Sequence, residues 1–323
     1  ILHGPLEAPS YEFENEYIFQ TEDYSKENIE SILSSFTLRP KISIITPVYN
    51  VAPEHLDKCI ESVLNQWYIN WELCLYDDFS SKPETIDCLQ KWIDTDPRIK
   101  IGLGKENQHI SLASNEAIKM ADGEFIALLD NDDELSENAL LEVVRALNDN
   151  PEIDFIYSDE DFITPEGRYF QPHFKTDFNL SLLLSHNYIT HFAVIRRNIG
   201  DKINWFRKGY EGAQDHDLFL RIIERTRKIY HIPKILYHWR QSNTSTSLNY
   251  NEKSYADKAA RKTLTDYATR NNIEMELLDG PGLGVYRFKR KIITNGKVSI
   301  IVPFKDQISY LKDCISSIIE KGG

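Results

Sequence analysis

Short apolar runs alternate with segments of helical periodicity between residues 41 and 161. The apolar runs are predicted to be strands, because they are short and mostly apolar: 42–47, 71–78, 98–103, 124–130 and 153–161. The spacing of apolar residues between them predicts helices over 56–65, 84–93, 111–123 and 137–149. This alternation indicates an α/β fold with a mixed, mainly parallel sheet flanked by helices.

The alternation breaks down after residue 170. We expect a strand at 191–197, a helix at 215–226, a strand bent at a proline over 228–240 and a helix at 254–270. A region of this kind usually builds the acceptor side of a cleft. The principal domain is therefore predicted to span 41–270, followed by a strand and linker region at 271–296.

The two ends of the chain differ from this domain. Residues 1–40 form a predicted extension with one amphipathic helix over 25–36. At the other end, KVSIIVPFKD (297–306) repeats KISIITPVYN (41–50), and LKDCISSII (311–319) repeats LDKCIESVL (56–64). We therefore expect residues 297–323 to be the truncated start of a second domain of the same kind. The first residue is not methionine, which favours a piece of a longer protein.

Polar and acidic residues occur at four predicted strand ends: 47–50, 77–78, 130–133 and 158–161. In open α/β sheets, ligands bind at the carboxyl ends of the strands. Solvated turns are the alternative explanation, since Asp and Asn favour turns.

The segment 130–133 carries three carboxylates, and such crowding raises a pKa unless a cation compensates. Mg²⁺ and Mn²⁺ prefer carboxylate oxygen, so a clamp for a diphosphate-bound cation is predicted here. A calcium loop would need a glycine that DNDDELSENALL lacks.

Three downstream residues leave alternatives open. Asp215 begins a predicted helix, where it is either an N-cap or a general base in a cleft. His238 is either a metal ligand or a packed core histidine. Arg240 pairs either with phosphate, which suits its planar guanidinium, or with a surface carboxylate.

Composition narrows the function classes. The net charge of −13 argues against nucleic acid as a partner. No apolar run is long enough to span a bilayer. The four cysteines form no zinc pair, and Cys59 and Cys74 are expected as buried thiols in a reducing compartment. No glycine-rich phosphate loop and no GxSxG motif occurs, which excludes dinucleotide-dependent hydride transfer and serine hydrolysis.

The order of the motifs resembles that of the family 2 glycosyltransferases, which have the GT-A fold. The motifs that carry the resemblance are ITPVYN, LYDDFS, ASNEAIKMADGEFIALLDNDDEL, YSDED, EGAQDHDLFLR and HIPKILYHWR. The combination is most similar to the bacterial branch that builds surface polysaccharides and glycan chains, often with tandem transferase domains.

The resemblance implies a nucleotide site at matching positions. Pro47 and Tyr49 would line the base pocket, Asp78 would bond the pyrimidine ring and Asp130 would bind the ribose. His109 stands where relatives often have glycine, so it would either contact the diphosphate or narrow the pocket.

The resemblance also implies the reacting groups. Asp132 would bind the metal, with Asp133 able to share that task, and His238 would complete the metal or diphosphate site. Asp215 would deprotonate the acceptor hydroxyl.

Three further residues are expected at the donor sugar or the acceptor: Asp159, Gln214 and Arg240. Relatives often have glutamate where this chain has Gln214, a change that would alter acceptor contacts.

The implied activity is an inverting, metal-dependent transfer from a nucleoside diphosphate sugar to a hydroxyl of a growing glycan. UDP-sugars are favoured, dTDP- and GDP-sugars are compatible, and Mn²⁺ or Mg²⁺ is the expected cofactor. The acceptor would be a glycan, glycolipid or glycoprotein. The protein is expected in the cytoplasm, including the inner face of the cell membrane through peripheral association.

Two alternatives belong to other classes. One is a non-catalytic subunit that binds nucleotide or glycan and supports a partner transferase. The other is a cation-dependent nucleotidyltransferase, which would need a basic phosphate loop near the first strand, and ITPVYNVAPEH has none.

Overall fold

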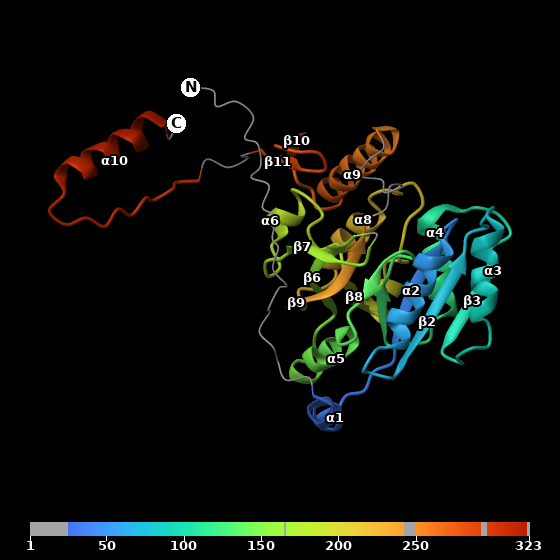
Figure 1. Cartoon of the computed structure of the whole chain (residues 1–323). Helices are drawn as coiled ribbons and strands as arrows, with labels where there is room; N and C mark the ends of the chain where they lie inside the picture. Colours follow the sequence, from blue (N-terminus) through green and yellow to red (C-terminus); the bar gives the residue numbers. More distant parts are fainter. Residues whose placement is uncertain (1–24, 165, 242–249, 292–295, 322–323) are drawn as a thin grey trace. The chain divides into compact units, whose positions relative to one another are not determined.

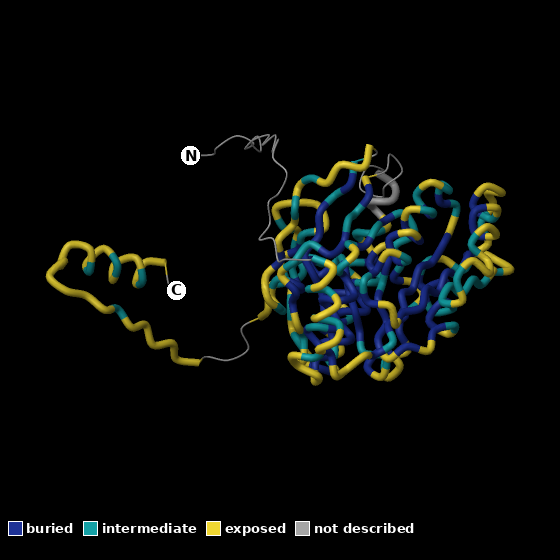
Figure 2. Tube along the Cα trace, turned by 60° about the horizontal axis from the view of Figure 1, so that its bottom comes forward, coloured by how far each residue is buried: buried dark blue, intermediate teal, exposed yellow. Residues whose placement is uncertain are grey.

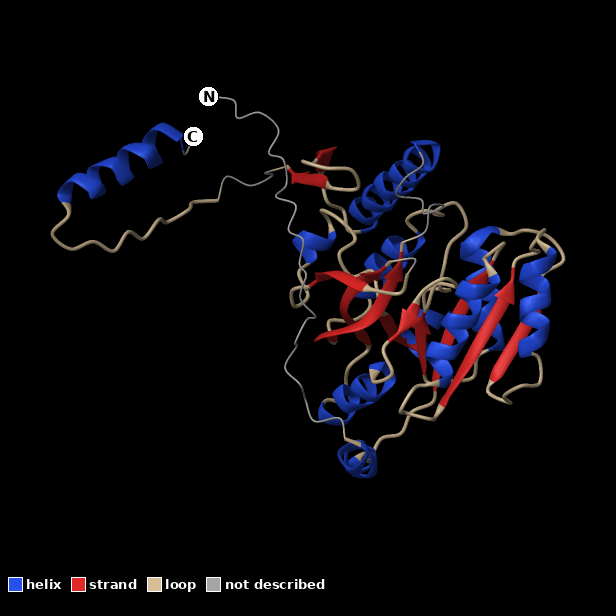
Figure 3. Ribbon diagram, viewed as in Figure 1, coloured by secondary structure: helices blue, strands red, loops and turns tan. Residues whose placement is uncertain are grey.

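The computed structural model describes residues 25–164, 166–241, 250–291 and 296–321 of the chain. The chain divides into two units, residues 1–289 and residues 290–323. Figure 1 labels the elements of both units along the sequence, and Figure 3 distinguishes their helices, strands and loops.

Most of the strands in the first unit form one sheet. The strands are β1 (Ile42–Val48), β2 (Trp71–Asp77), β3 (Ile99–Leu103), β4 (Phe125–Leu128), β5 (Glu134–Leu135), β6 (Phe155–Ile163), β7 (Tyr169–His173), β8 (Ala193–Arg196), β9 (Ile229–Arg240), β10 (Met275–Asp279) and β11 (Tyr286–Arg290). The sheet order is β3-β2-β1-β4-β8-β6-β9-β5, with β7 paired to β6, while β10 and β11 pair with each other. Strands β3, β2, β1 and β4 run parallel, and β8 is antiparallel to both of its neighbours. The predicted mixed α/β sheet is confirmed.

Helices cover both faces of this sheet. They are α1 (Lys26–Ser35), α2 (Pro53–Leu64), α3 (Pro83–Trp92), α4 (His109–Met120), α5 (Ala139–Asp149), α6 (Leu180–Leu183), α7 (Arg197–Asp201), α8 (Gln214–Ile223) and α9 (Tyr250–Arg270). One hydrophobic core lies under α2, α3 and α5, and a second lies under α4, α8 and α9. Figure 2 shows the buried chain concentrated in the interior of this unit.

The structure differs from the sequence-based prediction at β6. The predicted strand ended at residue 161 with its acidic residues 158–161 at the ligand edge of the sheet, but β6 continues to Ile163 and these residues lie buried inside it. Strands β7 and β9 flank this part of β6, so it is a central strand rather than a loop. The register between β6 and β9 shifts after Ser158, where Ile232 and Ile235 pair with consecutive residues and Pro233 lies in the bulge. The predicted bend of this strand at a proline is therefore confirmed.

One buried carboxylate is stabilised at the opposite end of the parallel strands. Glu72 on β2 lies 2.8 Å from Lys41 Nζ and 2.7 Å from Lys100 Nζ, and it accepts a 2.5 Å hydrogen bond from the Ser43 hydroxyl. Its side chain is 1% exposed. Burial alone would raise the pKa of Glu72, but the two ammonium groups and the hydroxyl hold that pKa well below its usual value.

Replacing Glu72 by glutamine is therefore expected to lower the free energy of unfolding by about 3 kcal/mol at neutral pH, because Lys41 and Lys100 lose the buried carboxylate that they share and keep only the exposed Asp122. The contribution of the carboxylate should be complete above its unfolded pKa of about 4.3 and should fall as the pH drops below that value, since its folded pKa is depressed. Urea unfolding of both proteins between about pH 7 and pH 3 measures this difference. Glu84→Gln, at an exposed position on α3, is the control. A Glu72→Gln penalty that stays constant over this range would contradict the assignment.

The second unit is described from residue 296 to residue 321. Its helix α10 (Ile308–Lys321) coincides with the repeat of the first helix of the principal domain. The repeat of the first strand, 297–306, has no strand in the described residues, and Val298 and Ile301 are 82% and 89% exposed. In the first unit the equivalent strand β1 pairs with β2 and β4. The assignment of 297–323 to a second domain stays a prediction.

None of the described helices is both long and apolar enough to cross a membrane.

Candidate active site

The segment 130–133, here called the acid loop, follows β4 and is held on one side by α2. The thiol of Cys59 donates to the carbonyl oxygen of Asp130 at 3.4 Å. One turn further along α2, the Ser62 hydroxyl accepts from the backbone N–H of Leu135 at 3.1 Å. Because these contacts come from one face of one helix, α2 fixes the position of the acid loop.

Strand β9 holds the acid loop from the other side. The Tyr237 hydroxyl donates to Asp133 Oδ2 at 2.5 Å, and the Arg240 backbone N–H donates to Asp133 Oδ1 at 2.7 Å. The guanidinium of Arg240 donates to the carbonyl oxygen of Asp132 at 2.8 Å and to the carboxylate of Glu134. Asp133 is fully buried and anchored at both oxygens, whereas the side chain of Asp130 is 49% exposed.

Three possible metal ligands come together beside this loop. One ligand atom from each of Asp130, Asp133 and His191 lies within 4.8 Å of the other two. His191 precedes β8, and its Nε2 lies 3.7 Å from Asp130 Oδ2. Its ring stacks on Tyr237 with the centroids 4.6 Å apart. The chain thus brings an imidazole and two carboxylates to one point.

Crowding shifts the pKa values of all three acids in the loop. Burial within the site, together with the charges of Asp132 and Asp215, raises the pKa of Asp130 to about 6 despite the opposing effect of His191. Burial is also the main cause that raises the pKa of Asp132, and burial with the neighbouring Asp132 charge raises that of Asp133 well above its usual value. Such a group of carboxylates is stabilised by a cation.

A buried ion pair lies beside His191. Glu160 on β6 accepts from the backbone N–H of His191, and its Oε2 lies 3.2 Å from His191 Nδ1. Lys175 Nζ lies 3.3 Å from the same oxygen and is fully buried. Burial opposes protonation of His191, but Glu160 and then Asp130 outweigh it and raise the pKa of His191 to about 9. A metal ion at Nε2 would take the place of that proton.

Asp215 faces the same cleft as the acid loop. Ala213 occupies the N-cap position of α8, so Asp215 is not the cap residue. Its Oδ2 accepts hydrogen bonds from Asn187 Nδ2 at 2.8 Å and from the Thr190 hydroxyl at 2.6 Å. A cleft is lined by Pro47, Asp130, His191, Gln214 and Asp215 together with apolar side chains. Asp215 and the first residue of the acid loop therefore line the same cleft.

The residues expected at the nucleotide gather where β1 and β2 end. Tyr49 follows β1 and is 49% exposed. The backbone N–H of Asp78 donates to the carbonyl oxygen of Val48 at 2.8 Å, and its carboxylate accepts from the backbone N–H of Gln108 at 2.8 Å. Exposed His109 begins α4 directly after this contact. The fold thus brings these positions to one edge of the sheet, and their roles at a nucleotide stay predictions.

The structure places three other expected residues outside the group of possible metal ligands. His238 Nδ1 lies 2.5 Å from Asp161 Oδ1 and its Nε2 lies 2.8 Å from the Ser136 hydroxyl, so both ring nitrogens already have partners. Asp159 is buried, with one oxygen 2.7 Å from His231 Nε2 and 2.8 Å from the backbone nitrogen of Lys175. Arg240 is 1% exposed and contacts the acid loop, so the alternative of a surface ion pair is wrong. Its expected place at the donor sugar or the acceptor stays a prediction.

His191 enters the sequence-based prediction only as the first residue of the strand expected at 191–197. An isolated histidine before a short apolar strand has no spacing that marks a ligand. Asn187 and Thr190, which orient Asp215, lie in an irregular segment and were missed for the same reason.

Comparisons with known proteins agree with this geometry. Residues 43–203 match the family model described as "Glycosyl transferase family 2". The chain belongs to this family and has the GT-A fold. It is 41% identical over 283 residues, 87% of its length, to an uncharacterized protein of Sinorhizobium fredii. It is 33% identical over 290 residues, 90% of its length, to the O-antigen biosynthesis protein RfbC of Myxococcus xanthus. The chain spans only 31% and 23% of the lengths of these two relatives.

Solved structures support the fold. The TarS protein of S. aureus in complex with UDP-GlcNAc has a TM-score of 0.55 and 17% identity, with 72% of each chain covered. The mannosyltransferase of Pyrobaculum calidifontis in complex with GDP-Man and Mn²⁺ also has a TM-score of 0.55 and 17% identity, covering 74% of this chain and 70% of its own.

Proposed function

We propose that this domain transfers a sugar from a nucleoside diphosphate donor, most favourably a UDP-sugar, to a hydroxyl of a growing surface glycan. The observation that carries the proposal is that Asp215 and the acid loop face one cleft. The relatives named for O-antigen and chondroitin synthesis support a polysaccharide acceptor. The buried free thiols of Cys59, Cys74 and Cys88 support a cytoplasmic location.

The residues present fit a divalent cation. The ligand atoms of Asp130, Asp133 and His191 lie within 4.8 Å of one another, and carboxylate and imidazole groups both bind divalent cations. Asp132, in the same loop, stays a candidate ligand beside them. A bound Mn²⁺ or Mg²⁺ would neutralise the charge that develops on the departing diphosphate.

Asp215 and the acid loop act at different atoms of the reaction. Asp215, held by Asn187 and Thr190, takes the proton from the acceptor hydroxyl as its oxygen forms a bond to the anomeric carbon. The bond from that carbon to the diphosphate breaks, and the diphosphate leaves with the electron pair. In such a single displacement the acceptor oxygen enters opposite the departing diphosphate, so the anomeric configuration inverts.

A screen of UDP-, dTDP- and GDP-sugars for released nucleotide tests this proposal. We expect slow release from one or more UDP-sugars with Mn²⁺ or Mg²⁺, loss of release in EDTA, and faster release when an acceptor is added. Nucleotide binding without release from any donor would instead favour the non-catalytic, nucleotide-binding alternative.

A further inference from the structure

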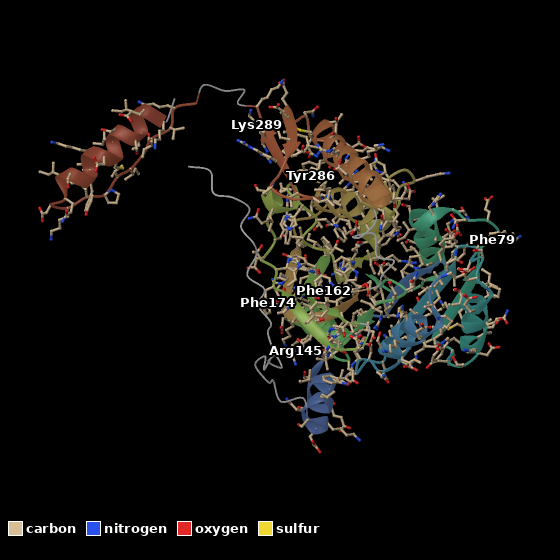
Figure 4. The ribbon with its side chains drawn as sticks, turned by 45° about the horizontal axis from the view of Figure 1, so that its top comes forward. Phe79, Arg145, Phe162, Phe174, Tyr286 and Lys289 are labelled. Carbon is tan, nitrogen blue, oxygen red and sulfur yellow. The ribbon has the colours of Figure 1, made fainter. Side chains whose placement is uncertain are left out.

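Three aromatic side chains form a row across three neighbouring strands: Phe170 on β7, Phe162 on β6 and Trp239 on β9. Phe162 is in register with both of the other two residues. Its ring centroid lies 5.6 Å from that of Phe170 and 5.1 Å from that of Trp239, where the rings are stacked. We call these three residues the aromatic strip; Phe162 is labelled in Figure 4.

The aromatic strip is not explained by the hydrophobic cores. Within the described part of the chain, neither core includes Phe162 or Phe170, and Trp239 only packs against the edge of one core. All three side chains are partly exposed. A continuous, partly exposed apolar surface on a folded domain usually marks a binding site.

The strip is continuous with the candidate active site. The Trp239 ring meets the His191 ring edge-on with the centroids 5.4 Å apart. His191 Nε2 in turn lies 3.7 Å from Asp130 Oδ2. The His191 ring therefore lies between the strip and the acid loop. From Trp239 on β9, the strip continues across β6 to β7.

Polar groups accompany the rings on the same face of the sheet. Glu160 is two residues before Phe162 on β6, and it is in register with His173 on β7. His173 Nδ1 lies 3.2 Å from Glu160 Oε1, and its side chain is 46% exposed. A surface that combines flat apolar rings with hydrogen-bonding groups fits a pyranose, which has apolar C–H faces and hydroxyl edges.

We propose that the aromatic strip binds the acceptor glycan, with pyranose rings stacked on Trp239, Phe162 and Phe170. Sugars whose ring hydroxyls are equatorial fit best, because both of their faces present C–H groups. The row of three rings favours an acceptor of several sugar units over a monosaccharide. This inference rests on the proposed transferase function and names an acceptor subsite that begins beside His191 of the candidate active site.

A binding experiment tests the strip without any donor. Cellotetraose is the probe, because its β-linked glucose units have only equatorial ring hydroxyls. ¹H–¹⁵N spectra resolve the indole N–H signals of the five tryptophans, and Trp239→Phe identifies the signal of Trp239. We expect millimolar cellotetraose to shift this signal. No shift of the Trp239 signal would overturn the proposal.

Variants connect binding to the strip. Trp239→Ala and Phe170→Ala should each weaken cellotetraose binding by about tenfold, a factor that corresponds to about 1.4 kcal/mol. Trp239→Phe should retain most of the affinity. Tyr230→Ala removes a 43% exposed aromatic ring from the same strand, β9, outside the strip, and should bind like the wild type. Equal losses in Tyr230→Ala and Phe170→Ala would overturn the proposal.

Transfer kinetics separate this inference from the function on which it rests. Once a donor is known, Phe170→Ala should raise the KM for a tetrasaccharide acceptor about tenfold and that for the nucleotide sugar less than about twofold. An increase confined to the KM of the nucleotide sugar would contradict an acceptor subsite. Failure of the wild type to release nucleotide from any donor would contradict the transferase function, and the cellotetraose titration would still decide the strip.

Discussion

Replacing Asp215 by asparagine is expected to lower kcat for sugar transfer by about 10²–10⁴-fold, the usual contribution of a general base. The amide cannot accept the proton of the acceptor hydroxyl, but it preserves the size of the side chain and still accepts hydrogen bonds from Asn187 and Thr190. The Kd of the nucleotide should change little, because the acid loop is intact. Transfer at saturating donor and calorimetry with the nucleotide measure the two quantities.

Asp94→Asn provides the matched control for this substitution. It makes the same chemical change at an exposed residue whose φ of 62° asparagine tolerates. It should transfer sugar at the wild-type rate. If Asp215→Asn retains a near-normal kcat, Asp215 is not the base.

Replacing Asp130 by alanine should remove most of the metal-dependent nucleotide affinity. Loss of a residue that only orients a ligand typically weakens metal binding by about 10–100-fold, so loss of a ligand should cost at least as much. Calorimetric titration of UDP with Mn²⁺ should therefore show a Kd raised by about 100-fold or more. In EDTA the Kd values of the variant and the wild type should differ much less, because the cation then contributes nothing to the nucleotide affinity of either protein.

The same titrations distinguish the two candidate imidazoles. His191→Ala should resemble Asp130→Ala, whereas His238→Ala should retain metal-dependent affinity, since Asp161 and Ser136 already use its ring nitrogens. Asp87→Ala, at an exposed position on α3, controls for the loss of one carboxylate. The reverse result, with His238 essential and His191 dispensable, would overturn the grouping of His191 with Asp130 and Asp133.

The parallel half of the fold was predictable because its signals are local. Each strand from β1 to β4 is a short apolar run, and the residues after β1, β2 and β4 meet at one edge as parallel strands require. The positions of Asp78, the acid loop and Asp215 follow from this rule and from the motif order. Their chemical roles remain predictions that the variants above address.

The second half depends on contacts between distant segments, which periodicity does not encode. The sequence of β6 predicts a strand whose acidic end lies at the ligand edge of the sheet, but β9 and β7 pair with this end, and Asp159 and Asp161 each lie beside a histidine of β9. His191 reaches the acid loop only because β8 inserts antiparallel between β4 and β6. The spacing of residues in the sequence does not predict that β8 lies between β4 and β6.

The contacts between α2 and the acid loop affect which parts of this domain can change by substitution. The contacts from Cys59 and Ser62 come from a helix in the parallel half of the sheet, whereas Asp215 and the segment that orients it belong to the other half. Substitutions around β7 and α8 that leave His191 and β9 in place would therefore change the surroundings of Asp215, while α2 and β9 keep the acid loop in position. In the proposed transferase, such substitutions would change the acceptor that is used without moving the loop that would bind the donor.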